Sequence, residues 1–189
     1  ACPKNLILFS WHGGEPTLLG IDYFRRIVEL QRKYLPVGRK IVNAMQTNGT
    51  LLDEEWCHFL AMESFHVGIS MDGPRELHDG YRVTKSEEYT HKRVVQSYRL
   101  LRKHRIICDV LCVVHNQNVR RPTAVFRFFK DLGVEYLQFI PLVVPREDGG
   151  VSEQSAPPDA YGNFLCKIFD EWVRYDIGRI VIQNFDEAT

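Results

Sequence analysis

Short apolar runs alternate with longer amphipathic segments along almost the whole chain, and this alternation restricts the fold more than any other feature. Six runs have the length and side chains typical of strands: Leu6–Ser10, Ile41–Gln46, His66–Met71, Ile106–Val114, Tyr136–Leu142 and Arg179–Gln183. Five segments carry apolar residues at helical spacing: Asp22–Leu35, Asp53–Met62, Thr90–His104, Thr123–Leu132 and Asp159–Tyr175. Strict alternation predicts an α/β protein with a parallel sheet and right-handed crossovers.

Residues typical of helix ends support these boundaries. Thr90 suits an N-cap, Pro122 a first helical turn, and Gly133 the position after a helix C-terminus. The segment Pro145–Pro158 is rich in Gly, Ser and Pro, but the alternation resumes after it, so it predicts a loop. We therefore expect residues 1–189 to form one domain.

The composition excludes several classes of protein. The 24 basic residues balance the 24 acidic ones, so no overall field favours nucleic acid or an anionic membrane. No apolar run has membrane-spanning length, and no signal peptide opens the chain. The five cysteines are odd in number and scattered, unlike a secreted disulfide framework. We expect a cytoplasmic protein without a nucleic-acid or membrane partner.

The loops that follow the predicted strands have unusual sequences. In chain order they read HGGEP, TNGT, MDGP, HNQN, PLVVP and NFDE. Ligands of barrels and of open α/β sheets bind at the carboxyl ends of the strands. We therefore expect these loops to share one rim, with a binding site on it.

The first of these loops suggests a ligand with an ammonium group. Gly13 and Gly14 expose their backbone, and Pro16 keeps Glu15 extended. Carbonyl and carboxylate oxygens accept hydrogen bonds, as an ammonium group requires. The alternative is a tight turn with an exposed glutamate.

Two further loops carry polar residues that could contact the same ligand. The Ser70 hydroxyl and the Asp72 carboxylate suit ribose hydroxyls or an amino-acid backbone, although Asp72–Gly73 is also a common turn. Arg82 could pair with a carboxylate, although most arginines are simply solvated.

His12 and Asp186 complete the candidate residues. Both should lie at strand ends, where an acid beside a bound substrate is placed to take a proton. The alternative for each is a solvated surface residue.

Cys108, Cys112 and His115 have a spacing close to that of iron–sulfur ligands, C-x3-C-x2-H. The surrounding segment is strand-like, however, and a straight strand spreads its side chains too far apart to surround a metal. We interpret Cys112, and also Cys57 and Cys166 on helical patterns, as small buried hydrophobic residues. We expect no metal ligand within the chain.

Together the loop motifs resemble those of the radical S-adenosylmethionine (SAM) enzymes. GGEP, TNG and SMDGP follow successive strands in that superfamily. The longer strings QTNGTLLDEEW and VGISMDGPRELHDGYR look most like the anaerobic sulfatase-maturating enzymes. The resemblance covers essentially the whole chain.

The resemblance implies a fold and a reaction. The fold is a partial (β/α)6 TIM-like barrel that holds a 4Fe-4S cluster and SAM. The cluster reduces SAM to a deoxyadenosyl radical, and a cysteine or serine of an unfolded or nascent sulfatase is oxidised to Cα-formylglycine. An electron donor such as flavodoxin or ferredoxin is a further implied partner.

The resemblance also implies roles for individual residues. Gly13, Gly14 and Glu15 would hold the amino group of SAM, and Arg82 its carboxylate. Ser70 would contact the methionyl or ribose part of SAM, with Asp72 a weaker candidate for the same contact. Val143 would pack near the adenine. Asp186 would be the general base, and His12 would contact the substrate.

The chain departs from the family in one respect. The family's cluster loop, C-x3-C-x2-C, precedes the GGEP strand, and this sequence contains no such motif. We expect a core domain without its first strand and cluster loop, with auxiliary 4Fe-4S clusters in a C-terminal domain beyond it, and no activity from this chain alone. Two alternatives are another radical SAM peptide-modifying enzyme, which forms a thioether or crosslink, and a cluster-free barrel that acts as a binding module.

Overall fold

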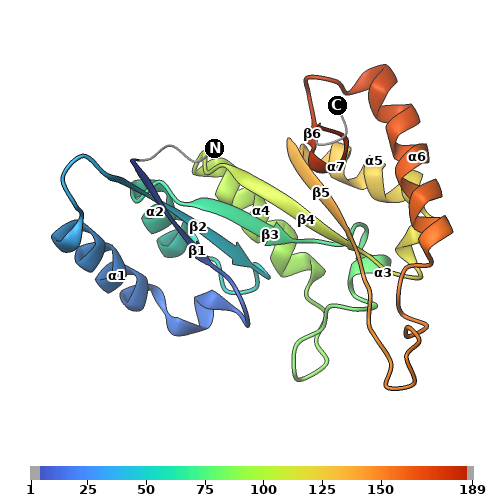
Figure 1. Cartoon of the computed structure of the whole chain (residues 1–189), viewed down its shortest axis with the longest axis horizontal. Coiled ribbons are helices and arrows are strands. Elements are labelled where there is room, and N and C mark those ends of the chain that lie inside the picture. The colour runs from blue at the N-terminus through green and yellow to red at the C-terminus, as the bar shows by residue number, and fades with distance from the viewer. Residues whose placement is uncertain (1–4, 187–189) are drawn as a thin grey trace. The chain divides into compact units, whose positions relative to one another are not determined.

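The computed structural model describes residues 5–186 and divides the chain into two compact units (Figure 1). The first unit holds the chain up to Ile69 together with Arg93–Cys108, and the second holds Ser70–Lys92 together with the chain from Asp109 onward. No helix within residues 5–186 is long and apolar enough to cross a membrane. Cys2 lies outside the described residues.

The first unit is built on β1 (Leu6–Trp11), β2 (Lys40–Thr47) and most of β3 (His66–Ser70), with parallel pairing of β1 to β2 and of β2 to β3. Its helices are α1 (Ile21–Tyr34), α2 (Glu54–Met62) and most of α4 (His91–Lys103). The ring of Phe24 on α1 packs edge-on against Trp11 of β1 and Trp56 of α2. These aromatic contacts fix the helices on one face of the strands.

The second unit contains the parallel strands β4 (Cys108–Val114), β5 (Tyr136–Pro141) and β6 (Val181–Ile182). Its helices are α3 (Arg75–His78), α5 (Pro122–Leu132), α6 (Pro158–Tyr175) and α7 (Gln183–Asp186). Phe139 of β5 packs against Phe164 of α6 with ring centroids 5.1 Å apart, and both rings are buried.

Burial alternates along the strands. In β4, one face is buried (Cys108, Val110, Cys112, Val114) and the other is accessible (Asp109, Leu111, Val113). In β5, Leu137 and Phe139 are buried while Gln138 is accessible. The helices therefore cover one face of these strands and leave the other, which carries polar and apolar side chains, accessible.

The α/β class, the six parallel strands and the five long helices are confirmed. The last strand is shorter than the expected Arg179–Gln183, because α7 begins at Gln183. The Asn184 side chain accepts a hydrogen bond from the Phe139 amide (2.8 Å) and donates one to its carbonyl (2.9 Å), so it replaces the next ladder bonds of β6.

Candidate active site

The loop after β1 presents open backbone. Gly13 and Gly14 are exposed and have φ angles of +85° and +54°. A Cβ atom added to either residue would meet nothing within 4 Å. These glycines are therefore required by the backbone conformation and not by packing within the chain, and they leave room for another molecule to approach.

The Glu15 carboxylate is bound by donors of the chain itself. Its Oε1 accepts hydrogen bonds from the Thr17 hydroxyl (2.6 Å), the Thr17 amide (3.1 Å) and the Thr47 hydroxyl (2.7 Å). Its Oε2 accepts one from the Asn48 amide (2.6 Å). The carboxylate thus ties the GGEP loop to the TNG loop after β2, and its remaining acceptor capacity lies on Oε2.

Asp72 and Arg82 form an ion pair in the second unit. Arg82 donates from Nε to Oδ2 (2.5 Å) and from Nη2 to Oδ1 (3.1 Å) of Asp72, whose side chain is only 2% exposed. The Val113 amide also donates to Oδ1 (2.9 Å), and the buried Asn118 side chain donates to the Asp72 carbonyl (3.2 Å). A guanidinium has five N–H donors, so the pair leaves Arg82 with donors for a second partner.

A second hydrogen-bonded connection lies behind this ion pair. The Asp72 amide donates to Nδ1 of His78 (3.3 Å), and Nε2 of His78 lies 3.0 Å from the Thr90 hydroxyl. That hydroxyl donates to the Arg82 carbonyl (2.7 Å). Thr90 precedes α4 as expected, but its hydroxyl bonds His78 and the Arg82 carbonyl and does not cap the helix.

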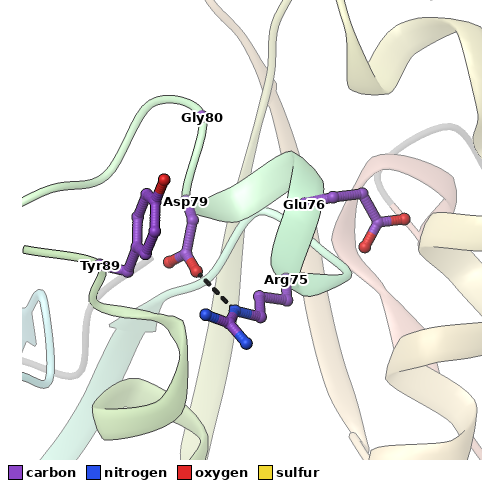
Figure 2. Close-up of a pocket in the computed structure, with 5 residues that line it drawn as sticks. All are labelled: Arg75, Glu76, Asp79, Gly80 and Tyr89. Carbon is purple, nitrogen blue, oxygen red and sulfur yellow. Dashed lines mark hydrogen bonds and ion pairs between the residues drawn. The ribbon is translucent and has the colours of Figure 1, made fainter.

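Asp79 takes over the capping of α4. Its Oδ1 accepts from the amides of Thr90 (3.2 Å) and His91 (2.9 Å), while its Oδ2 pairs with Nε of Arg75 (3.2 Å). This pair lines a pocket of about 350 Å³. In the close-up of the pocket, the exposed Tyr89 ring lies beside the pair (Figure 2). The guanidinium carbon of Arg75 lies 5.8 Å from the centre of that ring.

Three histidines of this region are removed from solvent to different extents: His78 and His115 are buried, and His91 is half-buried. Burial lowers the pKa of His78, which is 0% exposed, to about 4. Burial also lowers the pKa of His91 and of His115. The His115 ring stacks on Tyr81, whose hydroxyl donates to the Asn116 side chain (2.6 Å).

Ser70 and Val143 lie in loops or at strand ends of the second unit. Ser70 is the last residue of β3 and is half-buried. Val143 is 62% exposed, although the Leu142 and Val144 amides beside it are fixed by the Val114 carbonyl (2.8 Å) and the Ser155 hydroxyl (3.0 Å).

Asp186 ends α7 and lines a cavity of about 220 Å³ on the accessible face of β4, β5 and β6. Asp109, Tyr136 and Gln138 line the same cavity. Asp109 and Tyr136 belong to the beginnings of their strands, so the cavity does not sit purely at the carboxyl ends as the sequence suggested. In the first unit, His12 follows β1 and is exposed.

The Radical SAM superfamily model matches residues 3–129, which is more than half of the chain. The chain belongs to the radical SAM superfamily. It is 40% identical to the serine-type anaerobic sulfatase-maturating enzyme of Bacteroides thetaiotaomicron and 39% identical to the cysteine-type enzyme of Clostridium perfringens. The matches cover 96% and 94% of this chain but 47% and 49% of those enzymes, so the chain spans about half the length of these relatives.

Solved structures agree with this assignment. The chain matches native anSMEcpe with bound AdoMet and Cp18Cys peptide at a TM-score of 0.92 and 38% identity, over 97% of this chain and 52% of that one. Streptococcus suis SuiB matches at a TM-score of 0.65 and 12% identity, over 90% of this chain and 37% of that one. The second likeness shows the fold alone. The chain is thus the partial radical SAM barrel of a sulfatase-maturating enzyme homologue.

The described cysteines do not form an iron–sulfur site. Cys57, Cys108 and Cys112 are buried, and burial raises the pKa of Cys57 to about 11 and that of Cys112 well above its ordinary value. Within residues 5–186, no group of three His, Cys, Asp or Glu side chains could hold a metal ion. The interpretation of Cys166 as buried is wrong, because this residue of α6 is exposed.

Sequence reasoning did not predict that the following residues hold the loops in place. Thr47, His78, Asp79, Thr90 and Asn118 are buried and bind the backbone or side chains of the candidate residues. The one signal available for Thr47 was its position directly before Asn48–Gly49, at the end of a strand. Nothing in the sequence marks His78 as a partner of Thr90.

Proposed function

We propose that this chain is the radical SAM core of an anaerobic sulfatase maturase, which oxidises a cysteine or serine of a sulfatase polypeptide to Cα-formylglycine. The observation that carries the proposal is the match to anSMEcpe with bound AdoMet and Cp18Cys peptide, at 38% identity and a TM-score of 0.92. Identities of 40% and 39% to serine-type and cysteine-type relatives support the same activity and leave both target residues open.

Each of the two units contains groups whose chemistry suits a part of SAM. The backbone of Gly13 and Gly14 is open, and its carbonyls, with Oε2 of Glu15, would accept hydrogen bonds from the amino group. The unused N–H donors of Arg82 would bind the carboxylate. Ser70 and Asp72 would contribute at the methionyl and ribose part, and the exposed Val143 would cover the adenine. SAM, once reduced at an iron–sulfur cluster, supplies the radical that removes a hydrogen atom from the substrate.

Asp186 would act as the general base. A carboxylate in a cavity can take the proton of a substrate thiol or hydroxyl onto one of its oxygens, if the substrate side chain reaches it. The amide side chain of Gln138 lines this cavity and would offer donors to the peptide. His12 would contact the same substrate from the loop after β1.

The cluster would be held by residues outside this chain, because the sequence contains no C-x3-C-x2-C motif. Auxiliary clusters would lie in a further domain, and a flavodoxin or ferredoxin would supply the electron. We therefore expect this chain alone to be inactive.

The test uses the full-length protein with its cluster reconstituted anaerobically, a sulfatase peptide and the variant Asp186→Asn. We expect deoxyadenosine and peptide aldehyde from the wild type, and loss of the aldehyde from the variant. Asp170→Asn, an exposed carboxylate on α6, is the matched control and should retain activity. Full aldehyde formation by Asp186→Asn would remove Asp186 from the mechanism, and a wild type without either product would overturn the function.

A further inference from the structure

Asp72 and Arg82 are joined by two separate routes. The side chains meet directly in the ion pair, and the backbones are linked through His78 and Thr90. His78 and Thr90 are 0% and 5% exposed, so neither reaches the solvent or an external ligand. Their hydrogen bonds act on the loop that carries the Arg82 guanidinium.

Only one arrangement of protons satisfies this chain of bonds. The Asp72 amide is a donor, so Nδ1 of His78 must be the acceptor and Nε2 must carry the proton. Nε2–H then donates to the Thr90 oxygen, and the Thr90 hydroxyl proton goes to the Arg82 carbonyl. The bonds run in one direction from the backbone of Asp72 to the backbone of Arg82.

The hydrogen bonds through His78 and Thr90 restrict the position of the Arg82 backbone, which the ion pair with Asp72 does not. An arginine side chain has several rotatable bonds, so a carboxylate contact alone permits many positions of its backbone and of its remaining N–H donors. Anchoring the Arg82 carbonyl restricts the backbone, and Asp72 restricts the guanidinium. Together they hold the unused donors in one orientation.

We propose that His78 and Thr90 are positioning residues that orient Arg82 for the carboxylate of SAM. This inference rests on the proposed function, since Arg82 is the residue that would touch the ligand. Neither His78 nor Thr90 contacts SAM itself. Their contribution is the lowered cost of ordering Arg82 when the ligand binds.

The central test measures the dissociation constant of SAM for the full-length, cluster-loaded protein by anaerobic equilibrium dialysis. Thr90→Val keeps the shape and the backbone amide but removes the hydroxyl, and we expect it to weaken SAM binding about fivefold. Thr90→Ser keeps the hydroxyl and should restore binding to within about twofold of the wild type. Tyr161→Phe removes another hydroxyl that donates to a main-chain carbonyl (2.9 Å) and is the control for unspecific loss of a hydrogen bond.

A double-mutant cycle separates positioning from general stability. Arg82→Gln removes the group through which Thr90 would act, so Thr90→Val should add no further loss of SAM affinity in that background. A merely structural role would produce the same loss in both backgrounds. Thermal unfolding of all variants, without SAM, shows whether each is folded.

The outcomes distinguish the two proposals. If the wild type binds SAM and Thr90→Val binds it equally well, the positioning role is wrong and the proposed function stands. Additive losses in the cycle would also overturn the positioning role. If the wild type does not bind SAM at all, both the inference and the proposed function fail.

Discussion

At the scale of single residues, Glu15 and Asp72 show how a carboxylate can hold a loop in place through hydrogen bonds from within the chain. Glu15 accepts four hydrogen bonds from the chain, and Asp72 accepts three on its carboxylate. Charged acceptors that satisfy backbone amides hold loops rigidly, because each buried donor would otherwise be unpaired. Each carboxylate therefore fixes its own loop, while Oε2 of Glu15 keeps acceptor capacity and the Arg82 guanidinium keeps unused N–H donors for the proposed ligand.

The burial of His78 predicts a dependence of stability on pH. Its pKa is about 4 in the folded chain and 6.5 when exposed, so the unfolded state binds more protons between these pH values. Stability is therefore fully present above pH 6.5 and is lost as the pH falls toward 4, by about 3 kcal/mol in the free energy of unfolding. His91 and His115, whose pKa is also lowered by burial, add to the loss in the same direction.

Urea unfolding followed by circular dichroism between pH 7 and pH 4.5 measures this effect. His78→Gln should reduce stability at pH 7 and flatten the pH dependence, because the titrating group is gone. His66→Gln, at an exposed position, should leave the slope unchanged. A wild-type slope retained in full by His78→Gln would show that His78 does not titrate on unfolding.

At the scale of helices and strands, the elements predictable from sequence were those with strong periodicity. The long helices α1, α5 and α6 begin and end within about two residues of their expected bounds, because Pro122 and Gly133 act locally. The exceptions depend on distant partners. β6 ends early because the Asn184 side chain binds Phe139, and α4 is capped by Asp79, eleven residues before Thr90.

The candidate site was predictable to the same extent. The loop motifs identified Gly13, Gly14, Glu15, Asp72 and Arg82, since their residue types are unusual after a strand. The sequence could not show that Asp72 neutralises Arg82 or that Thr47 binds Glu15, because such pairs are separated by 10 and 32 residues. Side-chain partners across that distance are decided by the fold and not by local preference.

Replacing glycine by alanine should have opposite effects on stability at two positions, one in a helix and one in a loop. Gly162 lies inside α6, is exposed and has open space at its Cβ position, so Gly162→Ala should stabilise the chain by about 0.5–1 kcal/mol. Gly49 is buried with a φ of +72°, and an added Cβ would lie 2.6 Å from Cδ1 of Ile69. Gly49→Ala should destabilise by about 1–3 kcal/mol.

The midpoints of urea unfolding of the two variants and the wild type, measured together, show whether each substitution stabilises or destabilises the chain. A destabilised Gly162→Ala would show that α6 needs a conformation that alanine disfavours. An unchanged Gly49→Ala would show that the TNG loop relaxes freely, which the close contact with Ile69 argues against.

At the scale of the whole molecule, the burial of each cysteine determines whether its thiol can bind iron or be alkylated. Buried cysteines lie in both units: Cys57 and Cys108 in the first, and Cys112 in the second. Burial keeps Cys57 and Cys112 protonated through their raised pKa, and only the thiolate binds iron or reacts with an alkylating agent. Cys166 is exposed and should be the readily alkylated thiol among the four described.

This distribution predicts that the cluster proposed for the full-length protein does not depend on Cys108 or Cys112. The double variant Cys108→Ala/Cys112→Ala, reconstituted anaerobically, should bind the same amount of iron per protein as the wild type, although two small core side chains are lost and stability falls. The measurement is iron and sulfide content with the absorption spectrum of the cluster, and Cys166→Ala is the control at an exposed thiol. If the folded double variant lost the iron of one cluster, Cys108 or Cys112 would be a metal ligand. That result would contradict the prediction, which is based on the burial of both cysteines within β4.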